Sequence, residues 1–197
     1  GERYVPYPGC EDRSISAFSG TFPFAVIKPD DRLQAKAIDD YIEYEDTFGN
    51  MYSVGRGVCS WYACWKSVVF SRIGRHKAAF DSIDYVAGTA GDFGEMFEIN
   101  NKGSRTYYHP WFTTAAGMYV HAVNELFVRY DGDEIIVAEG LESDDFAFRG
   151  AIKGGMVVEV KVEGGKLALL KVEKNPNCEL GSVRVRLPEK LGGTVTV

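Results

Sequence analysis

The chain has 197 residues, of which 45% are hydrophobic and 13% aromatic, so it can build a packed core and wholesale disorder is excluded. The formal net charge is −6 and no basic patch stands out, which argues against nucleic acid as a partner. No apolar run approaches the roughly 20 residues needed to cross a bilayer, so the sequence predicts no membrane span.

Apolar residues recur at helical spacing over the first two thirds of the chain. Residues 29–45, PDDRLQAKAIDDYIEYE, open with a proline and two aspartates, which is typical of a helix start. Residues 59–74, CSWYACWKSVVFSRIG, have a broad apolar face and end at a glycine, and residues 75–88 follow at once. These two segments predict an antiparallel helical hairpin, and a further helix is predicted from Pro110 to before Asp131.

After residue 132 the period of the apolar residues falls to two, which indicates strands. Residues 133–140, DEIIVAEG, predict one short strand, and residues 156–173 alternate on either side of a Gly-Gly pair that is typical of a tight turn. Residues 182–189 and 193–197 predict two more strands. We therefore predict an α+β chain with a helical domain over residues 1–131 and an antiparallel β domain over residues 132–197.

The order of these elements resembles the C-terminal part of glucoamylase-like and fucosidase-like glycoside hydrolases. The resemblance is carried by residues 14–45, residues 57–86, the stretch FGEMFEINNKGSRTYYHPWFTTAAGMYVHAVNELF, and the strands from DGDEIIVAEG onward. The resemblance covers nearly the whole of this chain, but only about the last third of such an enzyme. It implies helices of a partial (α/α)6 toroid followed by a C-terminal antiparallel β-sandwich, with the barrel completed by a missing N-terminal segment or another chain.

Residues 91–112, GDFGEMFEINNKGSRTYYHPWF, crowd carboxylates and aromatic rings into a segment that fits neither a good helix nor a good strand. In an extended conformation, Phe93, Glu95 and Phe97 would point to one side. A carboxylate between two rings suits a sugar, whose C–H faces stack on rings and whose hydroxyls bond to a carboxylate. The plainer alternative is that Glu95 and Glu98 cap the next helix or face water.

By the resemblance, Glu95 matches the general base of the glucoamylase-like pattern and Phe97 matches its following aromatic residue. An inverting mechanism also needs a carboxylic acid roughly 6.5–9.5 Å from the base, and the resemblance puts this acid in residues that the chain lacks. The remaining candidates for substrate binding are Trp61, Trp111, His109 and Arg56. Each also has a plainer interpretation, because a tryptophan can belong to the core, a histidine to a structural loop and a Gly-Arg-Gly to an exposed turn.

The four cysteines and three histidines form no pattern that is typical of a metal site. Cys59 and Cys64 are not at a zinc-knuckle spacing, and no histidine lies close to them in sequence. The sequence therefore predicts neither a metal nor a cofactor. Reduced thiols in the core of a cytoplasmic protein are the favoured interpretation.

We predict an inverting-type glycoside hydrolase in which this chain supplies the C-terminal part of the catalytic barrel and binds a carbohydrate substrate. Enzymatic activity would then require residues or a subunit outside the chain. Two alternatives stay open: a non-catalytic carbohydrate-binding or scaffolding protein, and a phosphorylase of the same architecture. A third is an unrelated α+β domain whose aromatic residues all belong to the core.

Overall fold

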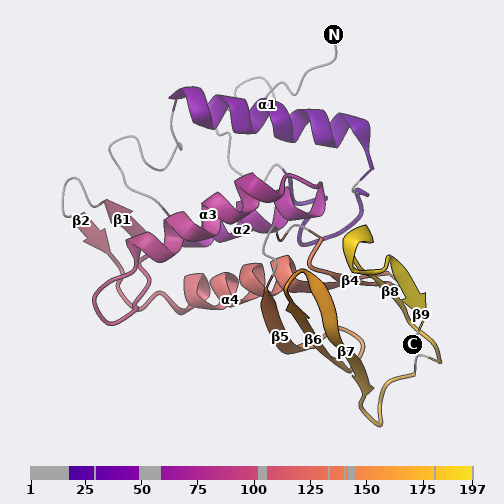
Figure 1. The fold of residues 1–197 in the computed structure, drawn as a ribbon. Coiled ribbons are helices and arrows are strands. Elements are labelled where there is room, and N and C mark those ends of the chain that lie inside the picture. Colours follow the sequence, from indigo (N-terminus) through magenta and orange to yellow (C-terminus); the bar gives the residue numbers. More distant parts are fainter. Residues whose placement is uncertain are drawn as a thin grey trace. The chain divides into compact units, whose positions relative to one another are not determined.

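The computed structural model describes residues 18–28, 30–48, 59–101, 106–132, 134–139, 141, 145–179 and 181–196. The chain divides into two compact units, of which the first extends to Ala122 and the second begins at Val123. Figure 1 shows that the first unit is mainly helical and that the second consists mainly of strands. The division falls inside a helix, a few residues before the change of period that the sequence placed between residues 131 and 132.

Each segment of helical period in the described part of the chain forms an α-helix. The four helices are α1 (Arg32–Phe48), α2 (Ser60–Arg72), α3 (His76–Thr89) and α4 (Thr113–Phe127). The Asp31 carboxylate accepts a hydrogen bond of 2.9 Å from the backbone N–H of Gln34, which caps the start of α1. The four predicted helices are therefore confirmed, although α1 continues beyond the predicted end at residue 45.

The turn between α2 and α3 is the one that the sequence predicted at Gly74. This glycine has a φ of 77°, and the N–H of Arg75 bonds to the carbonyl of Phe70 at 2.8 Å, which closes the end of α2. The guanidinium of Arg75 also donates two hydrogen bonds, of 2.6 and 2.7 Å, to the carboxylate of Asp39 in α1. This pair ties α1 to the helical hairpin.

Helix α2 is the centre of the first unit, because its buried residues lie on every side of the helix. The segment before α1 packs onto it: the indole N–H of Trp65 donates to the carbonyl of Phe22 at 2.9 Å, and Arg72 donates to the carbonyl of Thr21 at 3.2 Å. The guanidinium of Arg72 also lies 5.0 Å from the centre of the Phe22 ring, within the range of a cation–π contact. The apolar face predicted for residues 59–74 is thus the core of this unit.

Two three-residue strands, β1 (Ile99–Asn101) and β2 (Thr106–Tyr108), form an antiparallel hairpin within the segment that fitted neither a helix nor a strand. Two backbone bonds extend the pairing outward: Glu98 N–H to the His109 carbonyl at 3.3 Å, and Phe112 N–H to the Met96 carbonyl at 2.9 Å. The residues on both sides of the hairpin are therefore held against each other.

The second unit contains two sheets. One has the strand order β3-β4-β8-β9, from β3 (Val128–Asp131), β4 (Glu134–Val137), β8 (Arg184–Arg186) and β9 (Thr194–Thr196), with the 3-10 helix η2 (Glu189–Leu191) before β9. The other has the order β5-β6-β7, from β5 (Phe146–Ile152), β6 (Met156–Glu163) and β7 (Lys166–Lys174). Alternate residues of β6 are buried, which confirms the period of two, and they share one hydrophobic cluster with the inner face of the first sheet.

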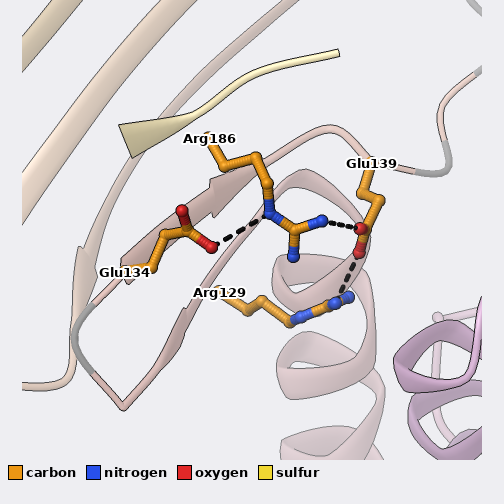
Figure 2. Close-up of polar contacts among 4 residues, drawn as sticks. All are labelled: Arg129, Glu134, Glu139 and Arg186. Carbon is orange, nitrogen blue, oxygen red and sulfur yellow. Dashed lines mark hydrogen bonds and ion pairs between the residues drawn. The ribbon is translucent and has the colours of Figure 1, made fainter. Parts of the chain in front are cut away.

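The opposite face of the four-stranded sheet carries a charged network. Arg129, Ile136 and Arg186 stand in one row across β3, β4 and β8. Figure 2 shows the carboxylate of Glu139 between the two guanidinium groups, at 2.5 Å from each. Arg186 also bonds to Glu134 at 3.0 Å. Arg129 is only 5% exposed, so Glu139 neutralises a buried charge.

The predicted fold class is wrong. The described residues hold four α-helices, too few for the closed ring of helical hairpins in an (α/α)6 toroid. The β domain is not an antiparallel sandwich either, because β4 and β8 pair in parallel. Periodicity identifies single helices and strands, but neither the number needed to close a ring nor the direction of a long-range strand pair is a local property of the sequence.

Candidate functional site

A tight turn sets the position of Glu95. The N–H of Gly94 bonds to the Gly91 carbonyl, and the N–H of Gly91 bonds to the Glu95 carbonyl, both at 2.9 Å. The Glu95 carboxylate accepts a hydrogen bond of 3.0 Å from the backbone N–H of Phe93 and lies against Gly91, where a Cβ atom would collide with it. The half-buried carboxylate is thus fixed by its own loop.

The two phenylalanines beside Glu95 have opposite environments. Phe97 is 8% exposed and belongs to the core, whereas Phe93 is 84% exposed. The expectation that both rings and the carboxylate point to one side is wrong, because Gly94, with a φ of 74°, turns the chain and the segment is not extended. Phe93 is therefore the ring of this pair that a ligand can reach.

The side chains of Glu98 and His109, which flank the hairpin, contact each other. The Glu98 carboxylate contacts Nδ1 of His109, and the two side chains are 39% and 75% exposed. His109 and Trp111 both have positive φ values, 49° and 62°, which non-glycine residues rarely adopt. Trp111 is 64% exposed, so this constrained stretch presents a large ring to solvent.

Three aromatic residues cluster in the first turns of α2. The ring of Trp61 lies 4.8 Å from that of Tyr62 and 5.2 Å from that of Trp65, and the Tyr62 and Trp65 rings stack at 6.2 Å. All three side chains are half-buried, so each has both a packed part and an accessible part. The sequence left open whether Trp61 belongs to the core or to the surface. In the structure its ring is partly packed and partly accessible.

Cys59 stands at the N-cap of α2 and its thiol is buried. Burial raises the pKa of the Cys59 thiol, the backbone N–H groups of Tyr62 and Trp61 lower it, and the charge of Glu98 raises it.

Among the predicted site residues, His109 is paired with Glu98, Trp111 follows that pair in the chain, and Glu95 precedes it in a separate tight turn. Trp61 contacts Tyr62 and Trp65 on the first turns of α2. Arg56 lies outside the described residues. Sequence reasoning gave no role to Cys59 or Tyr62 and did not pair Glu98 with His109, which lies eleven positions away and becomes its neighbour only through the hairpin.

The described residues bring no three metal-ligating side chains together, and their cysteines are free thiols. Complete burial raises the pKa of Cys64 to about 12, so this thiol stays protonated in ordinary solution. An open hollow of about 720 Å³ lies beside Asp39, Arg75, His76 and Lys77, and one of about 490 Å³ beside Glu139 and Arg186. Glu95 lines neither hollow.

Comparison with models of known protein families gives no match, and a sequence search against curated proteins finds no similar chain. None of the helices in the described ranges has the length and apolar character that would let it cross a membrane. The functional argument therefore rests on the side chains themselves.

Proposed function

We propose that the chain binds carbohydrate through a surface that we call the aromatic loop, made of residues 91–98 and 109–112, together with the start of α2. The observation that carries this proposal is the exposure of Phe93 and Trp111, at 84% and 64%, on a segment whose backbone is tied down by hydrogen bonds. Large exposed rings on rigid backbone bind the apolar C–H faces of sugars at little entropic cost.

The polar groups of the aromatic loop suit sugar hydroxyls. The Glu98–His109 pair is accessible. Its carboxylate can accept hydrogen bonds from sugar hydroxyls, and an imidazole nitrogen can form a further hydrogen bond to the same sugar. The positive φ values of His109 and Trp111 add support, because strained backbone is retained where the surrounding structure must hold a side chain in one position. The proposal also includes the half-buried ring of Trp61, which packs on Tyr62 and Trp65 at the start of α2.

The test is a titration with maltohexaose, cellohexaose and xylohexaose, followed by intrinsic tryptophan fluorescence and by calorimetry. Trp111→Ala should weaken binding of the accepted sugar by roughly tenfold or more, since a stacked ring contributes on the order of 1.5 kcal/mol. Phe80→Ala is the matched control, because Phe80 is an exposed ring on α3 and should leave affinity unchanged. Equal losses in both variants, or no binding of any of these sugars, would contradict the proposal.

Hydrolysis of a glycoside, with Glu95 as the water-activating base, is the second candidate. It is favoured by the fixed, half-buried position of the Glu95 carboxylate between two ordered turns, because a general base must be held rigidly. Glu95→Gln should abolish release of reducing ends and leave binding of the same oligosaccharide nearly intact. If the unmodified chain binds the oligosaccharide but releases no reducing ends, only the carbohydrate-binding function remains. If reducing-end product forms only when inorganic phosphate is present, the chain is a phosphorylase.

We also propose that the protein acts in the cytoplasm. The free thiols of Cys59, Cys64 and Cys178 support this location, since reducing compartments keep cysteines unpaired.

A further inference from the structure

A ligand-sized hollow lies on the polar face of the four-stranded sheet, within the second unit. It is the hollow of about 490 Å³ beside Glu139 and Arg186, and sites for small molecules in proteins commonly measure roughly 300–1,000 Å³. Its lining residues come from β4, β8, β9 and the segments that follow β4 and β8, and they include Ile136, Glu139, Arg186, Pro188, Gly193 and Thr194. None of these residues belongs to the aromatic loop, so the hollow is separate from the surface proposed to bind carbohydrate.

The register of the strands places the residues of this hollow side by side. Arg186 in β8 stands opposite Ile136 in β4 and opposite Thr194 in β9. The turn from β8 to β9 is tied to the sheet by two backbone bonds, from the N–H of Leu187 to the Gly193 carbonyl at 3.1 Å and from the N–H of Gly193 to the Pro188 carbonyl at 3.4 Å. The hollow is therefore formed by hydrogen-bonded backbone before any ligand arrives.

Arg186 and Glu139 supply the polar groups of the hollow. Arg186 donates through Nε to Glu134 at 3.0 Å and through Nη1 to Glu139 at 2.5 Å. Figure 2 shows no bond from its third guanidinium nitrogen, Nη2, to the other residues drawn. The side chains of Arg186 and Glu139 are 41% and 29% exposed, so an N–H donor and a carboxylate acceptor stand next to each other where a ligand can reach them.

The charges of this network balance, because its two arginines face two glutamates. The adjoining turn adds one charge of each sign at residues 189–190. A charged ligand would therefore lose its hydration in the hollow without gaining an unmatched opposite charge. The network still has donors to spare, because the buried Nε of Arg129 bonds to no group in the described part of the chain. It thus suits a neutral ligand that brings a hydrogen-bond acceptor.

We propose that the hollow binds a small neutral molecule in which a primary or cyclic amide is joined to a flat apolar ring. The carbonyl oxygen of the amide accepts a hydrogen bond from Nη2 of Arg186, and its N–H donates to the neighbouring carboxylate of Glu139. An amide is a neutral group that offers an acceptor and a donor side by side. The ring of the ligand lies against Ile136 and Pro188, which contribute apolar surface to the hollow. This site does not depend on the proposed carbohydrate binding.

The test compares benzamide, benzoate and benzamidine, which share one ring and nearly one shape but are neutral, anionic and cationic. Each is titrated into the full chain, and the backbone amide signals are followed by NMR. Benzamide should shift the signals of Gly193 and Thr194 with a dissociation constant in the millimolar range, the strength expected of so small a ligand. Benzoate and benzamidine should bind at least about tenfold more weakly, because their charges stay unmatched.

Two variants locate the bound benzamide. Arg186→Lys keeps the positive charge but removes the planar fork, so it should weaken benzamide binding by about tenfold. Arg184→Lys is the matched control, because Arg184 belongs to the same strand but does not line the hollow, and it should leave the affinity unchanged. Thr194→Phe tests the site without touching the network, since Thr194 is exposed at the hollow and a larger side chain there should block the ligand.

The proposal is overturned if benzamide does not shift Gly193 and Thr194, or if either charged compound binds as tightly as benzamide. It is also overturned if Thr194→Phe binds benzamide as well as the parent chain does, and this outcome can be read even where Arg186→Lys fails to fold. Loss of sugar binding in Trp111→Ala should leave benzamide binding intact, so the two proposals fail separately.

Discussion

At the scale of single residues, the most consequential side chains are buried ionisable groups and the groups that contact them. Glu139 is one, because it bridges Arg129 and Arg186 on the polar face of the four-stranded sheet (Figure 2). A buried guanidinium that loses its carboxylate has no water to replace it. Cys64 is another, since burial keeps its thiol neutral.

Replacing Glu139 by Ala should therefore destabilise the second unit by roughly 3–5 kcal/mol, the usual cost of stranding a buried charge. The measurement is the free energy of urea unfolding. Asp81→Asn is the control, because the Lys77–Asp81 pair is largely exposed and such pairs contribute little. A loss after Glu139→Ala no larger than that of the control would show that the network is not a source of stability.

The raised pKa of Cys64 predicts a dependence of stability on pH. Between its ordinary value of 9.0 and the folded value of about 12, the folded chain keeps a proton that the unfolded chain loses. This contribution to stability is fully present below pH 9.0 and is lost as the pH rises towards 12. Unfolding free energies across this range should fall more steeply for the parent chain than for Cys64→Ala, and identical slopes would refute the assignment.

At the scale of elements, the aromatic loop depends on the turn that holds Glu95. The Glu95 carboxylate packs against the backbone of Gly91, which is possible because Gly91 has no Cβ. The turn at Gly94 places Phe93 at the surface and Phe97 in the core. The loop is thus built by two glycines that sequence patterns mark only as breakers of regular structure.

Gly91→Ala should displace the Glu95 side chain and weaken sugar binding, because the added Cβ occupies the space of the carboxylate. Gly88→Ala is the matched control. Gly88 lies in α3 with open space around it, so alanine should preserve binding and stabilise the helix by up to about 1 kcal/mol. Calorimetric affinities and melting temperatures of the two variants check both statements. Unchanged affinity in Gly91→Ala would mean that the Glu95 turn is irrelevant to the ligand.

At the scale of the whole molecule, the sequence predicted the elements better than their assembly. Residues 59–74 and 75–88 formed the expected hairpin because their apolar spacing and Gly74 act locally. The toroid was wrong because it depended on helices that the described chain does not contain, and the parallel pairing of β4 with β8 joins strands about fifty positions apart. The short strands β1 and β2 were missed because three residues are too few to show a period.

For the candidate site as well, single residues could be predicted from the sequence but their tertiary contacts could not. Trp61, His109 and Trp111 could be singled out because tryptophans and histidines at helix starts are visible in any sequence. The partnership of Glu98 with His109 could not be seen, since it depends on the β1–β2 hairpin that brings the two residues opposite each other. Contacts of this kind are tertiary, and no local pattern encodes them.

The most direct measurement is an NMR titration that follows the indole N–H signals of the three tryptophans as the accepted oligosaccharide is added. The signals of Trp111 and Trp61 should shift with one common dissociation constant. The signal of Trp65 should stay in place, because its N–H is bonded to the carbonyl of Phe22. A response at Trp65 alone, or no shift at Trp111 when the sugar binds, would contradict binding at the aromatic loop.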